Sequence, residues 1–394
     1  MTCFRKALIS CVFSGGLVAA PTAAWGQETL WASTILEETE FEFEADLDLL
    51  IGLGESHAPR NGPYADLQLR GSSETFTDRG WRYGVDAQLN LTTGDGRRGL
   101  ARPGLTGPVS NGRPVAGLLT GLSSDPGLDA ADSRVFVDIA QIYLQTRWVK
   151  LRAGPGETAA RQEAAQSLHA FRLSRADSAV LDPTGLNLAD TRLSLAEGST
   201  QMSVQSQRII GLRISASYAP EAQPCARHCH PSGPEVLRAD LKSVWSLAAS
   251  FDRRIPSSGV RWSAGLGYEA AQADGPAAAR FDDPWLLRAD LVREAGPLTV
   301  SLSGLTGSDG YLDADYDSLG LNFALEQGDW AYGVELGYGQ SDLVQTESRS
   351  LMFGASRLVG ARGILGMSVM GVREESPGRD QDSLQLLVET GLRF

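Results

Sequence analysis

Apolar and polar residues alternate along most of this chain, and the alternation is clearest over residues 41–53. Phe41 and Phe43 begin a row in which every second residue is apolar, while the residues between them are mostly acidic. A period of two is that of a β-strand, whose successive side chains point to opposite faces. The pattern recurs and predicts fifteen further strands, with an ambiguous phase only over 134–145. These strands are expected at 65–70, 81–91, 134–145, 149–153, 200–208, 210–218, 241–252, 259–270, 284–292, 297–305, 317–326, 329–340, 349–357, 362–373 and 382–394.

The connections between the predicted strands alternate in length. Short ones such as 77–80, 253–258 and 327–328 separate long ones. The long connections are 93–133, 155–199, 219–240, 271–283 and 306–316. Bacterial outer-membrane barrels have short periplasmic turns and longer extracellular loops. The pattern therefore predicts an all-β protein: a transmembrane antiparallel β-barrel of about sixteen strands.

Aromatic residues at the strand ends favour the same interpretation. On the apolar faces, tryptophans follow short turns and tyrosines precede long loops. They are Trp81, Trp262 and Trp330, and Tyr218, Tyr268 and Tyr338, respectively. Tryptophan and tyrosine are enriched where a barrel meets the two membrane–water interfaces. We expect two aromatic girdles, one at each interface.

The two ends of the sequence add to this interpretation. Alternation continues to Phe394, with Leu392 and Val388 on the same apolar face. A barrel pairs its last strand with its first, which removes both sheet edges. At the other end, Arg5 and Lys6 precede an uncharged run and small residues, as in a secretory signal peptide. We expect a signal peptide over 1–26 with cleavage after 24 or 26, a short segment over 27–38, and the barrel over 39–394.

The overall hydropathy and the net charge of the chain agree with a membrane barrel and argue against nucleic acid as a partner. The hydrophobic fraction is 42% and the mean hydropathy is −0.15, as expected when only alternate residues face lipid. The formal net charge of −13 falls to −15 when Arg5 and Lys6 leave with the signal peptide. A chain this acidic is not expected to bind nucleic acid.

These features together resemble a Gram-negative general-diffusion porin of the trimeric type, as found in alphaproteobacteria. Residues 148–154 are similar to the strand that enters the third, inward-folded loop of that family, and residues 210–220 to the strand that leaves it. The resemblance implies an outer-membrane channel for ions and small hydrophilic solutes, with no cofactor and no catalysis. It also implies a homotrimer, contact with lipopolysaccharide, and recognition of Phe394, Leu392 and Val388 by the barrel-assembly machinery. The connection 93–133 is unusually long for such a barrel.

The resemblance also implies a constriction, because in this family the third loop folds into the pore and faces a basic wall. Acids opposite arginines set up a transverse field that favours polar solutes. The expected basic wall is Arg70, Arg82, Lys150, Arg152 and Arg213. The expected acids of loop 155–199 are Glu157, Glu163, Asp177, Asp182 and Asp190. Alternatively, these charges simply pair with one another.

Two loop motifs leave alternatives open. Cys225 and Cys229 lie in a long connection, and export favours a disulfide between them. With His228 and His230 beside them, the alternative is a metal site. Four acidic residues lie in or next to the connection 306–316 and could hold a divalent cation. We expect instead that they form a solvated acidic loop. They are Asp309, Asp313, Asp315 and Asp317.

No nucleophile elbow, phosphate-binding loop or zinc-protease motif occurs in the sequence. None of the histidines lies on an outward strand position beside a serine, so an enzyme is not expected. Two other functions stay open: a substrate-selective channel with a binding site at the constriction, and a structural or adhesive barrel with a plugged lumen.

Overall fold

The computed structural model describes residues 39–54, 63–77, 80–93, 105–124, 133–178, 181–223 and 236–394. The chain divides into two units, residues 1–40 and 41–394, and the barrel described below belongs to the second. The predicted signal peptide, the segment 27–38 and the pair Cys225 and Cys229 lie outside the described residues. Among the described residues, no helix is long and apolar enough to cross a membrane.

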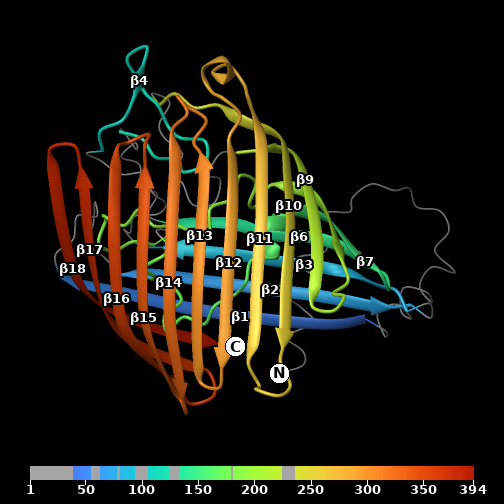
Figure 1. Cartoon of the computed structure of the whole chain (residues 1–394). Helices are drawn as coiled ribbons and strands as arrows, with labels where there is room; N and C mark the ends of the chain where they lie inside the picture. Colours follow the sequence, from blue (N-terminus) through green and yellow to red (C-terminus); the bar gives the residue numbers. More distant parts are fainter. Residues whose placement is uncertain are drawn as a thin grey trace. The chain divides into compact units, whose positions relative to one another are not determined.

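Sixteen antiparallel strands close into one barrel, which confirms the predicted fold class (Figure 1). Each strand pairs with its neighbours in sequence, except that β3 pairs with β6 and β1 pairs with β18. The connection 93–133 joins β3 to β6, and we call it the second long connection because residues 55–63 connect β1 to β2 before it. The barrel strands are β1 (Thr39–Gly54), β2 (Tyr64–Phe76), β3 (Arg82–Thr93), β6 (Ser133–Gln145), β7 (Val149–Pro155), β8 (Thr200–Ser206), β9 (Leu212–Ala222), β10 (Asp240–Arg254), β11 (Arg261–Asp274), β12 (Trp285–Ala295), β13 (Leu298–Ser308), β14 (Asp315–Gln327), β15 (Trp330–Ser341), β16 (Thr346–Val359), β17 (Gly363–Ser376) and β18 (Arg379–Arg393). Helical turns occur at α3 (Ala159–Gln162) and η1 (Ala278–Arg280).

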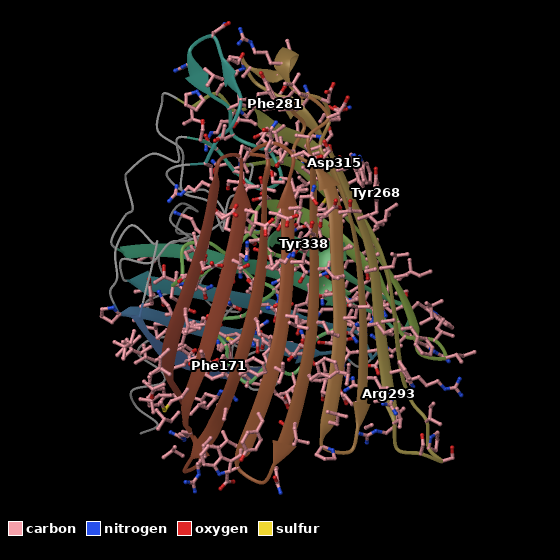
Figure 2. The ribbon with its side chains drawn as sticks, turned by 60° about the vertical axis from the view of Figure 1, so that its left-hand side comes forward. Phe171, Tyr268, Phe281, Arg293, Asp315 and Tyr338 are labelled. Atoms are coloured by element: carbon pink, nitrogen blue, oxygen red, sulfur yellow. The ribbon has the colours of Figure 1, made fainter. Side chains whose placement is uncertain are left out.

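Alternation sorts the side chains between the two faces of the barrel. In β1, the outward Leu47 and Ile51 are each 38% exposed, whereas the inward Asp48 and Leu50 are 5% and 0% exposed. The other strands repeat this arrangement, with apolar residues outside. Figure 2 shows the outward Tyr268 and Tyr338 nearer the long-loop end than Arg293, which lies near the short turns.

The seam between β1 and β18 closes the barrel. Leu47 lies opposite Leu392, and Ile51 lies opposite Val388. The N–H of Phe394 donates to the carbonyl oxygen of Ala45 at 2.8 Å, and the N–H of Ala45 donates back to Phe394 at 3.2 Å. Pairing the terminal strands removes two open edges.

A β-bulge explains why the phase of residues 134–145 is ambiguous in the sequence. Gln88 of β3 pairs with Ile139, but Leu89 pairs with Val137, so Asp138 is the extra residue. A bulge shifts the side-chain alternation by one position. The carboxylate of Asp138 is buried and accepts hydrogen bonds from Gln88 at 2.9 Å and Asn90 at 3.1 Å.

One assignment from the resemblance is wrong. Residues 210–220 do not leave the third loop: β8 does so, and residues 210–220 form the turn and most of the next strand, β9. The alternation itself predicts a strand at 200–208, directly after the loop, and this strand is β8. The error lies in the resemblance of residues 210–220, which placed the exit from the loop one strand too late.

The second long connection folds over the barrel's own loops. It contains a hairpin, β4 (Val109–Ser110) and β5 (Arg113–Pro114), whose turn is Asn111-Gly112 with φ of 53° and 73°. Asn-Gly is the preferred pair for a turn with two positive φ angles, so this hairpin has a sequence signal. Beyond it, three leucines are fully buried against residues of the third loop and other loops. They are Leu118, Leu119 and Leu122.

Candidate pore constriction

The third loop, residues 155–199, runs from β7 to β8 and packs against the inner face of the barrel. Thr158 caps α3, and the backbone N–H groups of the next two residues donate to serines of the wall. Ala159 donates to Ser217 of β9 at 3.0 Å, and Ala160 donates to Ser246 of β10 at 2.9 Å. A Cβ on Gly267 of β11 would lie 2.5 Å from Ala160, so this close approach needs glycine.

Glu269 of β11 holds both arms of the loop. Its carboxylate accepts hydrogen bonds from the hydroxyls of Thr158 and Ser194, the latter at 3.0 Å, and from the N–H of Leu195 at 2.7 Å. Glu269 is only 1% exposed. A buried charge with this many donors joins the beginning and the end of the loop at one point of the wall.

Farther along, the loop crosses to the last strands of the barrel. Glu335 of β15 accepts from the N–H of Ala176 at 3.0 Å, and Glu389 of β18 accepts from the N–H of Arg172 at 2.9 Å. Phe171, labelled in Figure 2, packs over Gly354, where a Cβ would overlap its ring. The loop therefore covers the inward faces of β8–β18, which we call the covered wall.

The five predicted loop acids have different environments. Glu157 is the accessible one, with 37% of its side chain exposed. Glu163 is buried against the covered wall, where it accepts from Ser215 at 2.6 Å and also from Ser250 and Gln205. Three more acids are buried inside the loop packing: Asp177, Asp182 and Asp190.

Glu163 is held as a carboxylate. Burial raises its pKa, but hydrogen bonds from Ser215, Ser250 and Gln205, together with Arg213 at 4.0 Å, outweigh burial and leave the pKa below its ordinary value. The charge attaches the loop to the wall, since its partners belong to the barrel strands.

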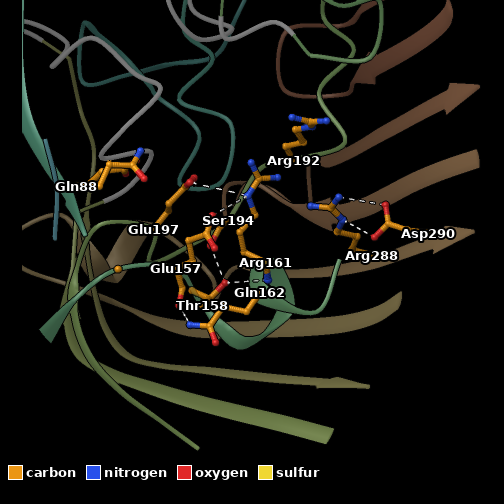
Figure 3. A network of polar contacts seen from close by, with 12 residues as sticks. Gln88, Glu157, Thr158, Arg161, Gln162, Arg192, Ser194, Glu197, Arg288 and Asp290 are labelled. Carbon is orange, nitrogen blue, oxygen red and sulfur yellow. Dashed lines mark hydrogen bonds and ion pairs between the residues drawn. The ribbon is translucent and has the colours of Figure 1, made fainter. Parts of the chain in front are cut away.

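A cavity of about 170 Å³ lies between the third loop and the opposite side of the barrel. We call that side, formed by β2, β3, β6 and β7, the open wall. Arg70 donates to Gln88 at 3.1 Å, and Arg152 donates to Gln162 of the loop at 2.8 Å. Figure 3 shows Gln88 apart from the cluster of Glu157, Arg161 and Gln162. The polar lining is Arg70, Ser72, Asp86, Gln88, Gln141, Arg152, Glu157 and Gln162.

The structure thus brings Arg70, Arg152 and Glu157 to one cavity. The other predicted basic residues do not line it. Arg82 lies 3.4 Å from Glu74, and the Lys150 ammonium lies 4.0 Å from the centre of the Tyr143 ring. The glutamines and Asp86 were not among the predicted site residues, although Asp86 and Gln88 fall on inward positions of a predicted strand.

A buried polar cluster forms around His169 of the loop. Its Nδ1 lies 2.9 Å from Glu335, and its Nε2 lies 2.5 Å from the hydroxyl of Ser167 and 3.3 Å from Arg192. Burial lowers the pKa of His169 to about 3, so the ring is neutral. His169, Asp177 and Glu335 place possible ligand atoms within 4.8 Å of one another. The buried Arg175 guanidinium interacts with both carboxylates and balances part of their charge.

The acidic segment after β13 corrects one expectation. Asp313, Asp315 and Asp317 are exposed, but Asp309 is fully buried. Its carboxylate accepts from the N–H groups of Leu119 at 3.1 Å and Thr120 at 2.8 Å. Asp309 is therefore not part of a solvated acidic loop. It attaches the second long connection to the loop after β13.

Comparison with known proteins gives the fold alone. No family model matches the chain, and no curated protein matches it. A porin refined at 1.8 Å is 13% identical with a TM-score of 0.53, over 90% of this chain and 100% of that one. The anion-selective porin from Comamonas acidovorans is 10% identical with a TM-score of 0.55, over 91% and 100%. OprB from Pseudomonas putida is 10% identical with a TM-score of 0.55, over 94% and 97%. The chain has the closed sixteen-stranded barrel fold of porins.

Proposed function

We propose that this protein is an outer-membrane porin, a water-filled channel through which ions and small hydrophilic solutes diffuse passively. The observation that carries the proposal is the third loop inside the barrel, which leaves a polar cavity of about 170 Å³ against the open wall. Arginine and carboxylate side chains on facing sides of such a gap stabilise polar solutes and disfavour apolar ones. The similarity to solved porins supports this role.

Single-channel recording in planar bilayers tests the proposal. A general-diffusion channel gives open, ohmic steps whose conductance rises in proportion to salt concentration. Silent membranes that demonstrably contain the folded barrel would contradict it and would favour a plugged structural or adhesive barrel.

A substrate-selective channel is the second candidate, and the glutamines at the cavity favour it. Amide groups of Gln88, Gln141 and Gln162 can donate and accept hydrogen bonds, which suits a neutral polar solute such as a small sugar. Saturation of the conductance block by one solute at low concentration would support selectivity. Equal partition of similar-sized solutes would support general diffusion.

We propose that the channel performs no catalysis. Ser167, His169 and Glu335 are joined in the order of a hydrolase triad, but Arg192 lies beside the same His169 nitrogen that faces the serine. The adjoining cavity is only about 20 Å³, which holds about one water. This cluster positions the loop, and a serine-directed fluorophosphonate should leave Ser167 unlabelled.

We also propose that the barrel assembles as a homotrimer through the outward face around β1. Phe43 is 58% exposed there and lies over Gly71 of β2, giving a broad apolar surface next to the seam. A heat-labile trimer on unheated gels is expected. A monomer in every mild detergent would contradict this assembly without affecting the channel proposal.

A further inference from the structure

Arginines stack on tryptophans at the short-turn end of the barrel, on its outward face. The Arg293 guanidinium lies 5.7 Å from the ring centre of Trp262, and that of Arg357 lies 5.4 Å from Trp330. In the turn between β6 and β7, Arg147 lies 5.2 Å from the ring centre of Trp148. All three arginines are exposed.

Strand register extends one of these pairs into a row. Arg253 of β10 is paired with Trp262 of β11, which in turn is paired with Arg293 of β12. Directly paired residues in antiparallel strands have Cβ atoms about 4.5–5.5 Å apart. Two exposed guanidinium groups therefore flank one tryptophan on the outside of the barrel. We call these three residues the Arg–Trp–Arg row.

These arginines lack acidic partners among the residues that the structure describes. Neither Arg253 nor Arg293 forms an ion pair or a side-chain hydrogen bond there, and the same holds for Arg357. Outward arginines at the long-loop end differ. Arg349 lies 2.7 Å from Glu347, and Arg373 lies 3.1 Å from Glu375. Among the described residues of these outward strand faces, the arginines at the short-turn end have no acid beside them, whereas those at the long-loop end do.

We propose that the Arg–Trp–Arg row is a binding site for the phosphate group of anionic phospholipids in the periplasmic leaflet, and that Trp330 with Arg357 forms a second, smaller site. Tryptophan lies at the headgroup level of a membrane, which sets the depth of the row. A guanidinium that stacks on an aromatic face keeps its N–H edge free, and that edge fits a phosphate in two-point contact. Anionic headgroups supply the missing counter-charge.

The proposal rests on the membrane-spanning barrel of the proposed function but not on ion conduction, so lipid binding and conductance can fail separately. Native mass spectrometry after exposure to equal amounts of phosphatidylglycerol and phosphatidylcholine measures the preference directly. We expect retained phosphatidylglycerol to exceed phosphatidylcholine. The double variant R253Q/R293Q should lower this ratio about thirtyfold, since two arginines near an anionic surface together contribute about 2 kcal/mol.

The matched control is R349Q/R373Q, which removes the same number of outward arginines from the opposite end and should leave the ratio unchanged. An equal fall of the ratio in both double variants would show that only net charge matters and would overturn the site. An unchanged ratio in R253Q/R293Q would also overturn it. If the glutamine variant does not fold, R253K/R293K carries the test. It keeps the charge but loses the planar fork, so the ratio should fall only partly, and an unchanged ratio would overturn the two-point contact.

Discussion

The covered wall and the open wall carry the same alternating sequence pattern, but their inward residues meet different neighbours. On the covered wall, carboxylates such as Glu269 and Glu389 accept hydrogen bonds from the third loop and are buried. On the open wall, Arg70 and Arg152 line the cavity. Inward-facing residues thus attach the third loop on the covered wall, whereas on the open wall they can contact solutes. Removing a charged side chain from the covered wall should therefore lower the stability of the barrel. Removing one from the open wall should change permeation through the channel.

The largest expected effect follows from removing an attachment point. Glu269→Ala leaves the buried donors of Thr158, Ser194 and Leu195 without their acceptor. We expect the free energy of unfolding to fall by about 3–5 kcal/mol, with larger and noisier channel conductance as the loop detaches. Denaturant unfolding in detergent micelles measures the first effect. Asp86→Ala on the open wall is the control, and an equal loss of stability there would remove the distinction between the walls.

The attachment of the second long connection should depend on pH. Burial raises the pKa of Asp309 to about 6 from 3.8. The pKa of Asp309 is therefore higher in the folded state than in the unfolded state. Protonated Asp309 contributes its full stabilisation below about pH 4, and this contribution is lost as the pH rises through 6. The loss in the free energy of unfolding is about 2–3 kcal/mol at most. Hydrogen exchange at the amides of Leu119 and Thr120, corrected for intrinsic rates, should show protection falling over this range.

Two variants test whether ionisation of Asp309 causes that pH dependence. Asp309→Asn cannot ionise and should abolish it, while Asp313→Asn, an exposed acid in the same loop, should preserve it. Protection that stays constant from pH 4.5 to 7.5 in the unmodified protein would show that Asp309 does not control this contact.

A smaller effect is expected on ion selectivity. The charges at the cavity nearly balance, with Arg70 and Arg152 against Asp86 and Glu157, while the chain as a whole is acidic. We expect weak cation selectivity that grows as salt is lowered and screening weakens. Neutralising Arg70 and Arg152 together should raise the cation-to-anion permeability ratio roughly threefold, with unchanged stability. Arg82→Gln, away from the cavity, should change the reversal potential less, and an anion preference in low salt would contradict the charge balance.

The smallest effect concerns the seam between β1 and β18. Phe394→Ala keeps the backbone hydrogen bonds to Ala45 but removes an outward aromatic side chain that is 62% exposed. We expect the yield of folded, membrane-inserted barrel to fall about twofold or more. Phe353→Ala, an outward residue within β16, is the matched control. Equal yields from the two variants would argue against Phe394 as an assembly signal.

The sequence predicted the barrel well because alternation is a local property. The strand count, the apolar face of each strand and the seam all follow from a period of two. In the sequence, the bulge at Asp138 appears only as an interruption of the alternation between apolar and polar residues. Its position cannot be read from one strand, since the partner strand decides where an extra residue is accommodated. Asn111-Gly112 carries a local signal for the hairpin inside the long connection, because this pair favours a turn with two positive φ angles.

The candidate site was less accessible to sequence reasoning. Arg70 and Arg82 both fall on inward positions, yet only Arg70 reaches the cavity. Glu157 and Glu163 lie in the same loop, yet one is accessible and the other is buried against Ser215. These outcomes depend on how the loop crosses the lumen, which is set by contacts between residues that lie as many as 217 positions apart in the sequence. No periodicity in the chain encodes that path.

Closure of the barrel between β1 and β18 has a consequence for folding kinetics. The partners Leu47 and Leu392 are separated by almost the whole chain, so the last pairing has the largest loop-closure entropy. Proteins with such non-local contacts fold slowly. Until β18 is available, β1 keeps a free edge that can pair with other chains. The unclosed chain is therefore prone to aggregate through this edge, and the time that closure takes sets how long the edge stays exposed.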